Sequence, residues 1–242
     1  MFTKSDKEFM QQLRIEHPDI YERVVDLHNR SKDDLRNGCH DISNIIAIIY
    51  GSYQLISLKH PELASDARWT TLDSDIRSLI SSMNSIGEYR YAASLEKTVE
   101  DADIYIKDTI DEICADLSIP VSQINMDISG ISCRIDIDPD KIAFVLNSLL
   151  TNILQIDPDT NIKINAFKSD NNLYIKISDS VGGLSDNIAE NLFRPFNTNK
   201  SSCIGMSLAT SYQILLAHNG ELTYTPNKEN GSTFTLIIPV TD

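Results

Sequence analysis

The sequence predicts an α+β fold in two parts, an N-terminal helical hairpin followed by an α/β two-layer sandwich. Apolar residues recur with alternating spacings of four and three over residues 42–56 and again over 72–86, which is the period of paired amphipathic helices. Later in the chain, short alternating segments typical of strands are interspersed with longer helical stretches. We therefore predict a helical domain over residues 1–95 and an α/β domain over residues 96–242.

The composition is that of an ordinary globular protein. The 242 residues, 41% of them hydrophobic and 23% charged, suffice to bury one large core or two modest ones. A net charge of −14 disfavours nucleic acid and anionic membranes as partners. The absence of an apolar run of about eighteen residues or of a signal peptide predicts no membrane span and a cytoplasmic location. The four cysteines lack metal-binding spacing and are expected to be free thiols.

The first hairpin helix is expected to end at Lys59. Pro61 cannot donate to the helix ladder and disfavours helical geometry in His60. The apolar stripe of this helix consists of Ile42, Ile46, Ile49, Tyr53 and Ile56, and that of the second helix of Leu72, Ile76, Leu79, Met83 and Ile86. One hairpin offers little apolar contact, so we predict a homodimer in which two hairpins form a four-helix bundle. Packing of the hairpin against its own chain is the alternative.

His40 lies on the side of the first helix opposite the apolar stripe. Its neighbours there are small or polar and include Asn44, Ala47 and Gly51, so a ligand or a protein could approach closely. An exposed histidine without function is the competing interpretation. A nucleophilic pair with Cys39 is disfavoured, because adjacent helix residues point about 100° apart.

The second part of the chain is predicted to combine helices and short strands. Helices are expected around residues 106–117 and over Pro139–Gln155, Ile188–Phe193 and Gly205–His218. Strands are expected over Ile124–Ile128, Cys133–Ile137, Asn161–Phe167, Leu173–Ser178, Glu221–Thr225 and Ser232–Val240. Strands with helices on one side make a two-layer sandwich.

The segment His40-Asp41-Ile42-Ser43-Asn44 has a spacing that suits phosphoryl chemistry. A neutral imidazole can attack a phosphoryl group while a neighbouring carboxylate takes the other ring proton. The segment resembles the phosphoacceptor motif of two-component sensor histidine kinases, and from His40 onward the chain resembles their transmitter core. The resemblance implies that His40 carries the phosphoryl group, that Asp41 assists it, and that Asn44 serves dephosphorylation of a partner response regulator.

Two downstream segments resemble the nucleotide-binding motifs of the same family. In Asn147–Gln155, Asn152 takes the position that holds Mg²⁺ against the ATP phosphates, and Ser148 stands where another asparagine is usual. An amide carbonyl oxygen is a hard ligand suited to magnesium. In the segment that begins at Asp179, this residue would accept the adenine amino group and Gly183 is retained. Val181 replaces a glycine there, and a β-branched residue adopts positive φ only at a cost.

The remaining motifs follow in the order of the family. Phe193–Lys200 resembles the segment before the ATP lid, and Cys203–Ala209 resembles the glycine motif that opens a helix after the lid, with Gly205 as the one retained glycine. His218-Asn219-Gly220 and Gly231–Phe234 also match. By resemblance, the nucleotide residues are Asn152, Asp179, Gly183, Lys200 and Gly205, with Asn152 also on the metal.

The resemblance implies a histidine kinase-like protein of two-component signal transduction. ATP and Mg²⁺ would be its cofactors, and His40 would exchange its phosphoryl group with an aspartate of a response-regulator receiver domain. The replaced glycines leave a second hypothesis open, an ATP-independent histidine phosphotransferase or phosphatase with a degenerate nucleotide site. Another ATPase of the same fold, such as a chaperone or gyrase type, fits less well because it lacks the histidine hairpin.

Overall fold

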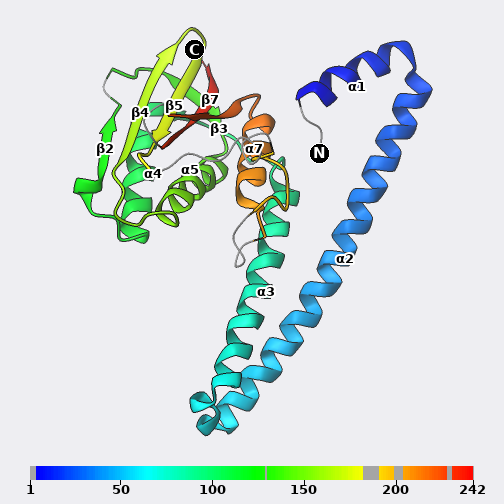
Figure 1. The fold of residues 1–242 in the computed structure, drawn as a ribbon. Helices are drawn as coiled ribbons and strands as arrows, with labels where there is room; N and C mark the ends of the chain where they lie inside the picture. Colours follow the sequence, from blue (N-terminus) through cyan, green and yellow to red (C-terminus); the bar gives the residue numbers. More distant parts are fainter. Residues whose placement is uncertain (1–3, 129, 182–190, 199–203, 228–230, 242) are drawn as a thin grey trace. The chain divides into compact units, whose positions relative to one another are not determined.

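The structure is a computed structural model that divides the chain into two compact units, Met1–Arg90 and Tyr91–Asp242 (Figure 1). It describes residues 4–128, 130–181, 191–198, 204–227 and 231–241. The predicted assignment of separate roles to residues 1–95 and 96–242 stays a prediction.

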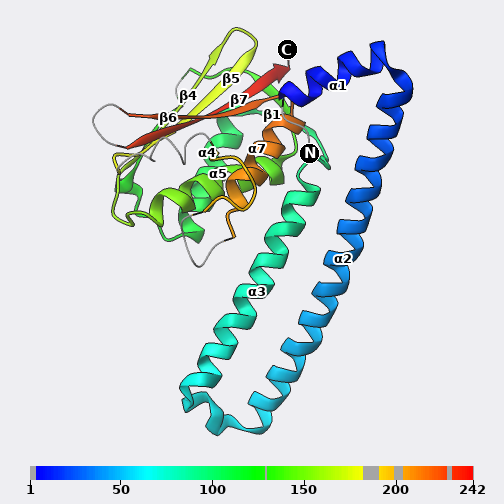
Figure 2. The same cartoon turned by 45° about the vertical axis from the view of Figure 1, so that its right-hand side comes forward.

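The first unit is helical. It comprises α1 (Lys4–Glu16), α2 (Pro18–Lys59), the short 3-10 helix η1 (Pro61–Ser65) and α3 (Ala67–Tyr91). Pro18 opens α2 at a position where its missing N–H costs no hydrogen bond. The predicted end of α2 at Lys59 is confirmed, and the predicted hairpin is formed by α2 and α3, which run in opposite directions on the two sides of η1 (Figures 1 and 2).

The apolar stripes of the hairpin have two environments. Ile46 and Ile76 are buried, with 5% and 6% exposure. Near the turn, the ring of Tyr53 stacks on Trp69 at 4.8 Å between centroids, and Trp69 Nε1–H donates to Ser57 Oγ over 3.0 Å. Other stripe residues remain 41–48% exposed within the chain, namely Ile42, Ile49, Ile56, Leu72 and Leu79. One hairpin therefore buries only part of its apolar surface.

The second unit is built on one seven-stranded sheet with the order β1-β3-β7-β5-β4-β2, and β6 also pairs with β7. The strands are β1 (Thr98–Asp101), β2 (Ile124–Asp127), β3 (Arg134–Ile137), β4 (Ile162–Ser169), β5 (Asn172–Ser178), β6 (Glu221–Pro226) and β7 (Ser232–Thr241). β2 pairs with β4 in parallel, and the other pairs are antiparallel. β1 is not among the strands that the sequence predicted.

Helices α4 (Ala102–Asp116), α5 (Pro139–Leu154) and α7 (Ser207–Ala217) cover one face of the sheet, and the short η2 (Val121–Gln123) precedes β2 (Figures 1 and 2). Alternate residues of β5 point into the core, where Leu173, Ile175 and Ile177 are fully buried. This arrangement confirms the predicted two-layer α/β architecture.

Two further points concern the predicted helices. Half of the helix expected over Ile188–Phe193, residues 188–190, lies outside the described residues, and its other half, residues 191–193, belongs to a turn instead of a helix. Within the described part of the chain, no helix combines the length and the apolar character needed to cross a membrane.

Candidate phosphoacceptor and nucleotide sites

His40 lies within α2 with its side chain 73% exposed. Two neighbours approach the same ring nitrogen. Asn44 Nδ2, one helical turn further on, lies 3.2 Å from His40 Nδ1, and Asp41 Oδ1 lies 3.7 Å from it. The three residues predicted for the phosphoacceptor site are thus gathered around one imidazole, which an incoming phosphoryl group can reach from solvent.

In the second unit, buried His218 ties the end of α7 to the start of α5. Its Nδ1–H donates to the Ile214 carbonyl over 2.8 Å, and its Nε2 accepts the backbone N–H of Asp138 over 2.9 Å. The second bond requires a lone pair on Nε2, so the imidazole is neutral. Burial lowers the pKa of His218 and outweighs the opposing effect of the bond to Ile214. Asp138 in turn caps α5, since its Oδ1 accepts the Lys141 N–H.

Asn152 faces the start of α7. Its Nδ2–H donates to Ser207 Oγ over 3.4 Å, and Gly205 lies two residues before this serine, so two predicted nucleotide residues meet at one helix terminus. The bond uses the nitrogen of the amide, whereas the carbonyl oxygen is the type of ligand that Mg²⁺ prefers. No cluster of three or more His, Cys, Asp or Glu suited to a metal occurs among the described residues.

Ser148 lies one turn before Asn152, at the position where the resemblance to the family leads us to expect another asparagine. The residue is 8% exposed, and its Oγ has no hydrogen-bond partner within the residues that the structure describes. A buried hydroxyl without a partner costs about 1–3 kcal/mol of desolvation. The substitution leaves an unpaired polar atom inside the α/β unit.

Asp179 follows β5 and is 8% exposed. Its Oδ2 accepts from Ser232 Oγ over 2.6 Å, and its Oδ1 accepts the Val181 N–H over 2.9 Å. The Asp179 N–H donates to the Ser232 carbonyl over 3.0 Å. Ser232 therefore orients the carboxylate predicted to read adenine. Ser232 lies in the predicted Gly231–Phe234 motif, but its role toward Asp179 could not be predicted because the two residues lie 53 positions apart in the sequence.

Glycines shape the two loops of the site. Gly231 has a φ of +93°, and a Cβ added there would lie far inside contact distance of the Asp179 carbonyl oxygen. Gly205 has a φ of +69°, and a Cβ there would lie 2.7 Å from the Asn197 oxygen. Val181, by contrast, is not among the described residues with positive φ. The strain anticipated from its side chain is therefore absent in this conformation.

The Gly205 carbonyl also accepts the N–H of Phe196 over 3.1 Å, which joins the turn at residues 191–196 to the start of α7. Phe196 itself has a φ of +63° and a 67% exposed side chain. The other two predicted nucleotide residues, Gly183 and Lys200, lie outside the described residues.

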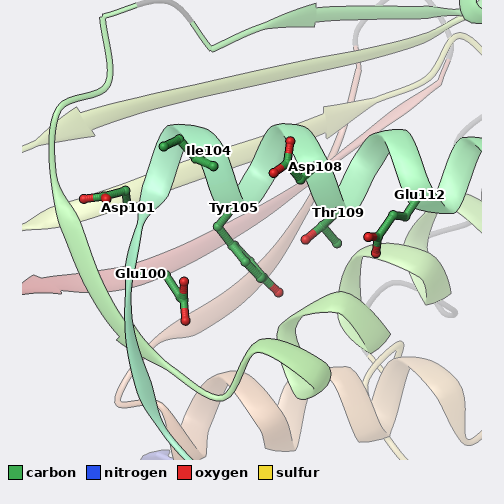
Figure 3. Close-up of a pocket in the computed structure, with 7 residues that line it drawn as sticks. All are labelled: Glu100, Asp101, Ile104, Tyr105, Asp108, Thr109 and Glu112. Carbon is green, nitrogen blue, oxygen red and sulfur yellow. The ribbon is translucent and has the colours of Figure 1, made fainter.

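A separate cavity of about 310 Å³ lies beside α4 and contains none of the predicted site residues (Figure 3). It is lined by Glu100, Asp101, Ile104, Tyr105, Asp108, Thr109 and Glu112. Its carboxylates would repel a triphosphate, and the Tyr105 hydroxyl is used internally, donating to the Pro139 carbonyl over 2.6 Å. This cavity is not the nucleotide site.

Comparison with known proteins gives a family for the second unit. Residues 137–242 match the family described as histidine kinase-, DNA gyrase B-, and HSP90-like ATPase. The chain is 32% identical over 108 residues to the sensor histidine kinase ZraS of Escherichia coli, which is 44% of this chain and 23% of that protein. It is 32% identical over 122 residues to the signal transduction histidine-protein kinase AtoS of Escherichia coli, which is 50% of this chain and 19% of that protein.

The fold is shared over a longer stretch. The crystal structure of full-length ShkA in complex with AMPPNP superposes with a TM-score of 0.70 at 14% identity, covering 86% of this chain and 46% of ShkA. The chain spans about a fifth to a quarter of the length of the curated relatives named above. Residues 137–242 thus match the family described as histidine kinase-, DNA gyrase B-, and HSP90-like ATPase, and the chain is similar in sequence to part of two sensor histidine kinases.

Proposed function

We propose that this chain is an ATP-dependent histidine autokinase that passes the γ-phosphoryl group of ATP to His40 and then to an aspartate of a response-regulator receiver domain. The observation that carries the proposal is the presence, in one chain, of a histidine kinase-type ATPase domain and of an exposed His40 with Asp41 and Asn44 at its Nδ1. The similarity to sensor histidine kinases supports the same activity and a receiver partner.

In this proposal, the nucleotide is held by residues at the ends of β5 and α7. Asp179 accepts a hydrogen bond from the adenine amino group. The N–H groups at the start of α7, next to Gly205, donate hydrogen bonds to phosphate oxygens. Gly183 and Lys200 join them by resemblance to the family. Asn152 would hold a Mg²⁺ ion, which would neutralise part of the negative charge on the phosphates. The AMPPNP in the complex of the structural neighbour ShkA is an ATP analogue, which supports nucleotide binding by this fold.

His40 is the nucleophile, and its exposure lets the phosphoryl donor and the receiver reach it in turn. Transfer needs mainly positioning and charge neutralisation. Ile48 and Leu55, 69% and 61% exposed, follow His40 on adjoining parts of the helix surface. Large exposed apolar side chains of this kind support docking of a protein partner beside the histidine.

The experiment is incubation of the chain with γ-labelled ATP and MgCl₂. We expect acid-labile, base-stable label on the wild type and none on His40→Ala. His60→Ala is the matched control, since His60 is another exposed histidine of the hairpin, and it should be labelled like the wild type. Equal labelling of His40→Ala would refute the assignment of His40.

A second candidate is an ATP-independent histidine phosphotransferase or phosphatase, favoured by valine and cysteine, Val181 and Cys203, at positions where the family has glycines. It predicts no heat in a calorimetric titration with ATP and Mg²⁺, together with labelling of His40 by a phosphorylated receiver domain. Binding heat that Asp179→Ala abolishes would exclude this candidate. The same titration without binding would exclude the autokinase.

We also infer a homodimer in which two hairpins form a four-helix bundle. The stripe residues that the chain leaves exposed, Ile42, Ile49 and Ile56, are 43–48% accessible and lie at the spacing of a bundle seam. A second copy would bury them with two-fold symmetry.

A further inference from the structure

Asn44 and Asp41 make incompatible demands on the same atom, His40 Nδ1. The amide nitrogen of Asn44, at 3.2 Å, is a donor and needs a lone pair on Nδ1. The Asp41 carboxylate, at 3.7 Å, is an acceptor and needs a proton there. A neutral imidazole carries one proton on its two nitrogens, so it can satisfy one neighbour at a time. The shorter distance belongs to Asn44.

The choice of neighbour decides which nitrogen can react. When Asn44 donates to Nδ1, the proton resides on Nε2, and Nε2 has no free lone pair. When Asp41 accepts from Nδ1–H, the lone pair resides on Nε2. Because both neighbours crowd Nδ1, Nε2 is the nitrogen open to an incoming phosphorus atom. The tautomer therefore determines whether the open nitrogen is a nucleophile.

We propose that Asn44 is a positioning residue that holds neutral His40 in the Nε2–H tautomer. When the hydrogen bond from Asn44 is lost, His40 changes to the Nδ1–H tautomer, Nδ1–H donates to Asp41, and Nε2 becomes nucleophilic. The kinetic consequence rests on the proposed function, whereas the tautomer itself does not. Asn44, one helical turn after His40, thus restrains the same imidazole that the adjacent Asp41 activates.

The transfer step balances in this scheme. Nε2 of the Nδ1–H tautomer attacks the γ-phosphorus of ATP, the Nε2–P bond forms, and the bond from phosphorus to the bridging oxygen breaks. ADP leaves with the electron pair, and the proton on Nδ1 passes to Asp41. Nδ1 of the phosphorylated ring then has a lone pair again, to which the Asn44 amide can donate.

The test is ¹⁵N NMR of the full chain with labelled histidine, at a pH well above the ordinary histidine value of about 6.5. The His40 signals are assigned by their loss in His40→Ala. We expect the Nε2–H pattern in the wild type. Asn44→Ala should shift the tautomer ratio toward Nδ1–H by about two- to tenfold, the range that one net hydrogen bond supports. Asn37→Ala, an exposed asparagine of the same helix, should leave the ratio unchanged.

A double variant that also removes the acceptor Asp41 tests the other half of the inference. Asn44→Ala combined with Asp41→Ala should return the ratio toward Nε2–H, because no carboxylate then draws the proton to Nδ1. A wild type already in the Nδ1–H form, or an Asn44→Ala variant with an unchanged ratio, would overturn the inference. A shifted ratio without phosphoryl labelling of any variant would support the inference and overturn the proposed function. When both hold, Asn44→Ala should be labelled faster by the same factor.

Discussion

Replacing Gly231 by alanine should unfold the Asp179 loop more than any other single methyl addition at a glycine of positive φ in the described chain. Gly231 has a φ of +93°, and its added Cβ would strike the carbonyl oxygen and carbon of Asp179 and the Ser180 Cα. These are backbone atoms, so no side chain can rotate out of the way. The two strand ends must separate.

The expected loss has two sources. A left-handed conformation costs a residue with a Cβ about 1–2 kcal/mol. Separation also breaks the Ser232 Oγ–Asp179 Oδ2 bond of 2.6 Å, a hydrogen bond to a charged group, which is worth about 1.5–3 kcal/mol. We therefore expect Gly231→Ala to lower the free energy of unfolding of the second unit by about 2.5–5 kcal/mol.

Gly130→Ala is the matched control. Gly130 also has positive φ, +83°, but apart from its chain neighbours no described residue has an atom within 4 Å of its added Cβ. It should lose only the conformational part, about 1–2 kcal/mol. Hydrogen exchange measured by mass spectrometry on peptides of β5 and β7 is the appropriate assay, because the single tryptophan, Trp69, lies in the helical unit. Equal losses in the two variants would refute the argument that the contact with Asp179 matters.

Three further predictions concern His218, the buried serines and the helical stripe. Burial lowers the pKa of His218 in the folded protein. The contribution of neutral His218 to the free energy of unfolding is therefore complete above the ordinary value of about 6.5 and is lost as the pH falls from there toward the lowered pKa, by at most about 1.4 kcal/mol per pH unit. The free energy of unfolding of His218→Gln, followed by urea denaturation across this range, should lack that slope, and an unchanged slope would contradict it. Ser148→Ala should stabilise the second unit by about 1 kcal/mol, since it removes an unpaired buried hydroxyl, whereas Ser211→Ala should destabilise it by about as much. Thermal melts in which both serine variants change the stability in the same direction would contradict this prediction. Ile49→Glu should convert a dimer into a monomer by light scattering, while Leu58→Glu, at a 79% exposed position off the stripe, should not; a dimeric Ile49→Glu would count against the bundle.

Local signals in the sequence sufficed for most elements. The end of α2 follows from Pro61, and the β4–β5 hairpin follows from two alternating segments around Asp170, whose φ is +51°. The four-residue β1 was missed because Val99 is its one large apolar residue and because its partner, β3, lies some thirty residues later. Pairing over such a separation leaves no local pattern.

The site was predictable in its residue types but not in its contacts. Motif order identified Asn152 and Asp179, yet the partner of Asp179 lies 53 residues away and that of Asp138 lies 80 residues away. The conformational cost considered for Val181 does not arise in this conformation, because Val181 is not among the described residues with positive φ, and a backbone angle cannot be read from sequence. Contacts between distant segments and individual φ values are set by the assembled sheet.

The hydrogen bonds around Asp179 have a consequence for the choice of base. With Ser232 Oγ on one oxygen and the Val181 N–H on the other, the group is held as an ionised acceptor and has no proton to donate. An adenine amino group would meet it as donor to acceptor. Guanine would present a carbonyl oxygen at the same place, so that two acceptors would face each other at a carboxylate residue that is only 8% exposed. Discrimination against GTP would thus arise from repulsion built into a carboxylate that the protein itself has already oriented.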